Sequence, residues 1–182
     1  TGLTLAVARR AMAELAALRG RTGLRLTFNV PLAVLLQPDL PPALRRIARE
    51  TRFDPAGLLL ELTESTQVRD TALLCRALRR LRRNGLGVLL DDFSLDDPRR
   101  PLIGFPFTGI KLDRSLVTAL PAERRARGEV EHLAATVRAA GGTVIAEGVT
   151  DPRLWRAAAA AGCDCAQGFG VGRPLPPGAL HA

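Results

Sequence analysis

Short apolar segments rich in strand-forming residues alternate with amphipathic helical segments along the whole chain of 182 residues. The pattern predicts six strands, at residues 24–30, 57–65, 86–93, 107–113, 143–149 and 163–175. It predicts helices at residues 5–18, 41–53, 71–85, 123–142 and 151–162. Because strands that alternate with helices pair in parallel through right-handed crossovers, the fold class is α/β, either an open doubly wound sheet or a barrel. Six strands in a chain of this length favour a (β/α)8 barrel that lacks one or two units.

The composition is that of an ordinary globular domain. Hydrophobic residues make up 47% of the chain and charged residues 24%, which excludes a disordered or fibrous protein. The length predicts a single domain over residues 1–182. No apolar run approaches the roughly 20 residues of a membrane-spanning helix. The chain starts at Thr1 without a leader, so we expect it to be truncated at its N-terminus.

The formal net charge of +8 raises the possibility of a nucleic-acid partner. Arginine pairs such as Arg45–Arg46, Arg79–Arg80 and Arg82–Arg83 lie within helical patterns, and no aromatic residues stand between them to stack on bases. The distribution therefore favours solvated basic helix faces over a nucleic-acid site.

The three cysteines, Cys75, Cys163 and Cys165, form neither a disulfide framework nor a C-x-x-C motif. We expect buried free thiols in a reducing, cytoplasmic compartment. His132 and His181 stand alone in the sequence, so a zinc site is not favoured.

Polar residues recur where the predicted strands end. They are Asn29, Glu61, Glu64, Asp91, Asp92, Lys111, Asp113 and Glu147. In a parallel barrel the carboxyl ends of the strands face one mouth, so these side chains are expected to converge there. Like charges held close together need a counter-ion, and carboxylate and amide oxygens are the ligands of Mg²⁺ or Mn²⁺.

Each of these residues also has an alternative structural role. Asn29 and Glu64 could lie in turns, and Asp91–Asp92 and Asp113 could cap the elements that follow. Glu147 could be a buried acid paired with an arginine. The recurrence of polar groups at successive strand ends favours a common site.

Lys111 is the only lysine among 26 lysine and arginine residues, which suggests that its position requires an amine. A lysine can orient a water molecule or form a Schiff base, whereas an arginine cannot form one. A Schiff-base aldolase is therefore an alternative hypothesis, although it leaves the acidic residues unexplained.

Six segments occur in an order that resembles the EAL domain family, bacterial phosphodiesterases that hydrolyse cyclic di-GMP to pGpG. These segments are TFNVPLAVL, ELTES, LLDDF, IKLDRSLV, VIAEGVT and GCDCAQGFGVGRPL. They are similar to the family's N-L-S segment, E-[IL]-T-E-S, D-D-F, K-[IL]-D-R-S-F-V, A-E-G-V-E and G-C-D-x-x-Q-G-[YF].

The resemblance implies a (β/α)8 TIM-like barrel of the EAL type, incomplete at the N-terminus, with two Mg²⁺ or Mn²⁺ ions. It implies that Asn29, Glu61, Asp91 and Glu147 hold the first ion and that Asp92 helps to hold the second. The implied catalytic residues are Lys111 at the attacking water, Glu147, Asp113 as its neighbour and Gln167 as a water-positioning residue. Glu64 is similar to the residue that braces the loop after Asp91–Asp92.

The family resemblance also implies partners: cyclic di-GMP, a second copy of the chain, and an upstream GGDEF or sensory domain. The sequence departs from the family in two places. The first strand, which carries the glutamate-alanine-leucine motif, is absent, and the loop from Asp91 to Arg100 lacks the family's glycines. We therefore expect a phosphodiesterase with a weakened second metal site. The alternative is a catalytically degenerate domain that senses cyclic di-GMP or binds a protein.

Overall fold

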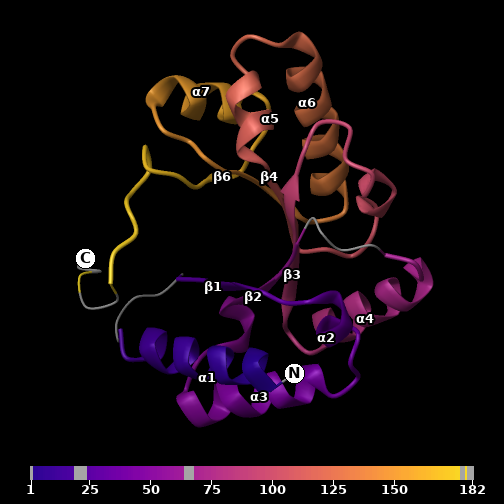
Figure 1. Ribbon diagram of the computed structural model, residues 1–182, viewed down its shortest axis with the longest axis vertical. Helices are drawn as coiled ribbons and strands as arrows, with labels where there is room; N and C mark the ends of the chain where they lie inside the picture. Colours follow the sequence, from indigo (N-terminus) through magenta and orange to yellow (C-terminus); the bar gives the residue numbers. More distant parts are fainter. Residues whose placement is uncertain (1, 19–23, 64–67, 177–178, 180–182) are drawn as a thin grey trace. The chain divides into compact units, whose positions relative to one another are not determined.

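The protein is described by a computed structural model that covers residues 2–18, 24–63, 68–176 and 179 (Figure 1). The chain forms two compact units. The first comprises Thr1–Val88 and Leu175–Ala182, and the second comprises Leu89–Pro174. The expectation of one domain over residues 1–182 stays a prediction.

The described residues of the first unit form two paired strands, four α-helices and one 3-10 helix. Its elements are α1 (Gly2–Ala16), β1 (Leu26–Asn29), α2 (Leu32–Leu35), α3 (Leu40–Thr51), the 3-10 helix η1 (Pro55–Gly57), β2 (Leu58–Leu62) and α4 (Thr71–Arg83). β1 and β2 are parallel, and their register places Asn29 beside Glu61. α1 packs against α3 and β1. All five residues of β2 are buried, as expected for an apolar strand of a parallel sheet.

The sequence of α4 explains its limits and its orientation. The Asp70 carboxylate accepts a hydrogen bond of 2.8 Å from the Leu73 backbone N–H and so caps the first turn. Leucines 74, 78 and 81 are buried on one face. Arg79, Arg82 and Arg83 are exposed, as predicted for a solvated basic face. Arg80 is an exception, because it is partly buried and its Nη2 donates to the Leu36 and Gln37 carbonyl oxygens at 2.9 and 3.1 Å.

The second unit contains a run of parallel strands. Its elements are β3 (Gly87–Phe93, from Leu89 onward), the 3-10 helix η2 (Arg100–Leu102), β4 (Gly109–Leu112), α5 (Arg114–Ala119), α6 (Arg124–Ala139), β5 (Thr143–Ala146), α7 (Pro152–Ala160) and β6 (Cys165–Ala166). β4 pairs in parallel with β3 and with β5, and β5 pairs with β6. α6 packs against β5, while α5 contacts α6 and α7 (Figure 1).

The predicted alternation of strands and helices is confirmed in both units. The structure adds α2 and α5, which are too short to produce a helical period in the sequence. The last predicted strand is reduced to the two residues of β6. None of the helices within the described ranges combines the length and the apolar character needed to traverse a bilayer.

The expectation of buried thiols is wrong for Cys165 and is met only in part for Cys75 and Cys163. All three are free, and Cys75 and Cys163 are partly buried, but Cys165 is exposed. Cys165 lies on the two-residue strand β6, which pairs with β5 alone among the described residues. Burial raises the pKa of the Cys163 thiol to about 11, and the charge of neighbouring Asp164 acts in the same direction.

We expect iodoacetamide at pH 8 to alkylate Cys165 about tenfold faster than Cys163 or more, because Cys165 is exposed and the Cys163 thiol stays almost fully protonated, while the thiolate is the reactive form. A time course followed by tandem mass spectrometry measures both rates. Equal rates at the two positions would contradict the structural assignment of Cys163 as the shielded thiol.

Candidate functional site

A bulge at the end of β3 changes the direction of two consecutive side chains. The pairing with β4 places Leu90 beside Ile110 and Phe93 beside Leu112, so Asp91 and Asp92 together oppose Lys111. Asp92 has a φ of 50°, in the left-handed region that aspartate tolerates better than most residues. In a regular strand, consecutive side chains point to opposite faces, and the bulge removes this constraint for Asp91 and Asp92.

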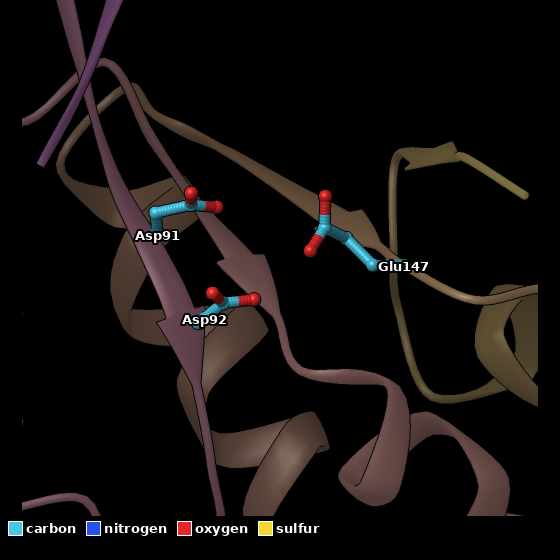
Figure 2. Close-up of side chains that lie close together, drawn as sticks. All are labelled: Asp91, Asp92 and Glu147. Carbon is cyan, nitrogen blue, oxygen red and sulfur yellow. The ribbon is translucent and has the colours of Figure 1, made fainter. Parts of the chain in front are cut away.

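The bulge brings both carboxylates towards Glu147, which follows β5 (Figure 2). Asp91, Asp92 and Glu147 each offer a carboxylate oxygen, and these three oxygens lie within 4.8 Å of one another. The backbone N–H of Glu147 donates to the Leu112 carbonyl at 3.2 Å, which continues the β4–β5 pairing and fixes the start of this segment.

Lys111 lies between two of these acids. Its Nζ is 2.8 Å from Asp91 Oδ1 and 2.7 Å from Glu147 Oε1. The side chains of Lys111 and Asp91 are only 7% and 8% exposed, and that of Glu147 is 17% exposed. An amine in two ion pairs is held as an ammonium, whereas a Schiff-base lysine must be neutral to attack a carbonyl. The contacts therefore oppose the aldolase alternative.

The electrostatics of the cluster favour a further positive charge. Burial raises the pKa of Glu147, the hydrogen bond and charge of Lys111 oppose this shift, and the charges of Asp91 and Asp92 reinforce it. With all three carboxylates ionised and the amine protonated, the cluster would carry a net charge of −2. A divalent cation would neutralise it, and oxygen ligands suit Mg²⁺ or Mn²⁺. The donor set therefore fits the predicted metal, while the identity of the ion stays a prediction.

Two other predicted residues lie near this cluster along the chain but have local structural roles. The Asp113 carboxylate accepts hydrogen bonds from the Ser115 backbone N–H at 2.8 Å and from the Ser115 hydroxyl, so it caps α5. The capping alternative is therefore correct for Asp113. Gln167 is exposed, and its backbone donates to Ala146 at 2.8 Å and accepts from Val149 at 3.0 Å. Their catalytic roles stay predictions.

The remaining predicted ligands lie in the first unit. Asn29 is exposed and Glu61 is buried at the carboxyl ends of β1 and β2. Asn29 also contributes to a cavity of about 450 Å³ whose other walls include Leu3, Val7 and Phe28. The sequence did not reveal this cavity, because it depends on how α1 lies against β1. Glu64, the predicted loop-bracing residue, lies outside the described residues.

A buried ion pair in the loop after β3 was also missed. Arg99 and Asp97 are both buried, and Arg99 Nη2 lies 2.7 Å from Asp97 Oδ2. The proline-rich sequence around Pro98 predicted only a loop. In the sequence, an aspartate and an arginine two residues apart look the same whether they form a buried ion pair or are solvated in a loop.

Comparison with known proteins places these observations in a family. The family model described as "EAL domain" matches residues 1–174. An uncharacterized signaling protein of Caulobacter vibrioides is 35% identical over 178 residues, with 96% of this chain and 21% of that protein covered. Cyclic di-GMP phosphodiesterase PA2567 of Pseudomonas aeruginosa is 31% identical over 177 residues, with 96% and 30% covered. The chain thus spans less than a third of the length of these relatives.

A solved structure gives the same assignment. The fold is similar to that of the PaMucR phosphodiesterase in its c-di-GMP complex, with a TM-score of 0.84, 25% identity, and coverage of 99% of this chain and 74% of that one. The prediction of a TIM-like fold of the EAL type is confirmed, with six strands among the described residues against eight in a complete barrel. This chain belongs to the EAL domain family.

Proposed function

We propose that this chain is a phosphodiesterase domain that hydrolyses cyclic di-GMP to pGpG with the help of divalent metal ions. The observation that carries the proposal is the cluster of Asp91, Asp92 and Glu147 around the ammonium of Lys111. A relative supports this proposal: PA2567, which is 31% identical to this chain, is named as a cyclic di-GMP phosphodiesterase.

The residues of the cluster have two different roles, metal binding and orientation of the attacking water. Asp91, Asp92 and Glu147 hold Mg²⁺ or Mn²⁺, which when bound lowers the pKa of a water molecule and stabilises charge on the leaving oxygen. Lys111 keeps two of the carboxylates in position and donates a hydrogen bond to the attacking water. Burial of Lys111 and Asp91 limits competing hydration of their charges.

The other family-based assignments belong to the same proposal. Asn29 and Glu61 act as further metal ligands, and Asp113 and Gln167 order the water. A second ion next to Asp92, a homodimer, an upstream GGDEF or sensory domain and a cytoplasmic location are parts of this proposal that only experiments on the chain can test.

We expect the purified chain to convert cyclic di-GMP to pGpG in the presence of Mn²⁺ or Mg²⁺, and to lose this activity when the metal is chelated. Asp91→Asn should lower turnover by about 100-fold or more, because even groups behind a metal ligand contribute 10–100-fold. Chromatography of the nucleotide products measures both effects.

Asp39→Asn is the matched control, because Asp39 precedes α3 without a side-chain capping hydrogen bond. It should leave turnover unchanged. Absence of pGpG with every metal would contradict the proposal. Binding of cyclic di-GMP without turnover would instead indicate the degenerate sensor.

A further inference from the structure

The left-handed backbone of Asp92 needs support from its surroundings. Its φ of 50° lies in the left-handed region, which costs free energy for a residue with a side chain even though aspartate tolerates it better than most residues. The sequence from Val88 to Ile103 contains no glycine. Asp92 lies in the bulge of β3, and in a regular strand without the bulge the carboxylates of Asp91 and Asp92 would point to opposite faces. The geometry of the acidic cluster therefore depends on what holds this one peptide.

Arg99 contacts that peptide directly. Its Nη2 donates a hydrogen bond of 3.0 Å to the backbone carbonyl oxygen of Asp92. The same nitrogen donates to Asp97 Oδ2 at 2.7 Å, and Nε donates to Asp97 Oδ1 at 3.0 Å. The guanidinium thus joins the Asp97 carboxylate to the bulge in one planar fork.

Asp97 is itself fixed by the loop backbone. Its Oδ1 accepts from the Arg99 backbone N–H at 2.7 Å, and its Oδ2 accepts from the Ser94 backbone N–H at 3.4 Å. Burial acts to raise the pKa of Asp97, but the hydrogen bonds and charge of Arg99 outweigh it and lower the pKa. The carboxylate therefore stays ionised and anchors the guanidinium.

The pair is a poor device for stability alone. Its side chains are 6% and 3% exposed, and a buried ion pair often contributes less to stability than apolar residues of the same volume. Within the described part of the chain, Arg99 Nη1 has no hydrogen-bond partner. Burying these two charges costs desolvation free energy that the pair does not fully recover. We therefore expect the main effect of the pair to be on the geometry of the loop rather than on the stability of the chain.

We propose that Arg99, oriented by Asp97, is a positioning residue that holds the Asp92 peptide in the left-handed bulge and so presents Asp91 and Asp92 together to a divalent cation. This inference rests on the proposed function, in which these carboxylates bind the metal. Arg99 acts through the Asp92 backbone and contacts neither the ion nor the substrate.

The test compares Arg99→Lys with Arg100→Lys. Lysine keeps the charge but cannot reach Asp97 and the Asp92 carbonyl with one planar fork. Arg100 pairs with Glu129 at 2.5 Å, and its side chain is 41% exposed, so the same change there is the matched control. We expect Arg99→Lys to raise the dissociation constant for Mn²⁺ about tenfold, whereas Arg100→Lys leaves it unchanged. Isothermal titration calorimetry without nucleotide measures the constants.

The metal-free unfolding temperature of each variant separates positioning from general destabilisation. If Arg99→Lys does not fold, Asp97→Asn takes its place, since it weakens the anchor and keeps the guanidinium; a smaller rise in the Mn²⁺ dissociation constant is then expected. Equal Mn²⁺ affinity in the folded variant and the unmodified chain overturns the inference, as does an unmodified chain that binds no Mn²⁺. If the affinities differ as expected but no pGpG forms, the proposed function fails while the positioning role stands.

Discussion

We expect replacement of Lys111 by methionine to lower the rate of cyclic di-GMP hydrolysis about a thousandfold, because loss of one positioned donor at a developing charge typically costs 10²–10³-fold. Methionine has nearly the length of lysine without its charge. The change removes the ion pairs to Asp91 and Glu147 at 2.8 and 2.7 Å together with the proposed contact to water. Product chromatography at saturating Mn²⁺ measures the rate.

The structure also sets a stability cost for this variant. Removal of the ammonium leaves two largely buried carboxylates without their counter-ion, and breaking a buried pair costs about 3–5 kcal/mol. Added Mn²⁺ should recover part of this loss, so circular dichroism and thermal unfolding need to be recorded with and without the metal. Such a recovery would also report on the predicted metal site.

Arg138→Met is the control for loss of a cation. Arg138 pairs with Asp164 at 3.2 Å and its side chain is 58% exposed, so its removal should leave turnover close to that of the unmodified chain. Full turnover in a folded Lys111→Met variant would rule out the proposed role of the amine.

The sequence predicted the parts of the fold that local patterns determine. The apolar run around Leu58–Leu62 gave a buried strand at the expected place. The helix predicted over residues 71–85 ends at Arg83 and is followed by Asn84 and Gly85, whose φ is 76°, as the Asn-Gly stop signal indicates. Strand length was predicted less well, since the last strand depends on pairing with β5 and retains only Cys165 and Ala166.

The sequence predicted which residues of the candidate site lie close together, but it did not predict the geometry of their carboxylates. The rule that parallel strands end at one edge correctly brought Asp91, Asp92 and Glu147 together with Lys111. No periodicity encodes the bulge, because the φ of Asp92 depends on contacts made seven residues later by Arg99. Prediction therefore succeeded for the strand scaffold and failed for the loop that sets the carboxylate geometry.

We expect Gly168→Ala to destabilise the chain by about 3–5 kcal/mol, since backbone strain and overpacking each cost about 1–3 kcal/mol. Gly168 has a φ of 150°, and a Cβ at this position would lie 2.3 Å from the Val149 carbonyl oxygen and 2.5 Å from the Val149 nitrogen. These atoms cannot move aside freely, because Val149 accepts a hydrogen bond from Gly170 and donates one to Gln167. Thermal unfolding should show a midpoint lower by about 10 °C.

Gly128→Ala is the matched control and should change stability in the opposite direction. Gly128 lies inside α6, and a Cβ there would meet no atom within 4 Å, so alanine should stabilise the chain by about 0.5–1 kcal/mol. Both variants replace a glycine by an alanine. A difference in their free energies of unfolding therefore reports the steric clash at Gly168 and the higher helix propensity of alanine at Gly128. If Gly168→Ala were as stable as the unmodified chain, the close approach of the Gln167–Gly168 turn to Val149 would be wrong, and with it the placement of Gln167 beside the segment that carries Glu147.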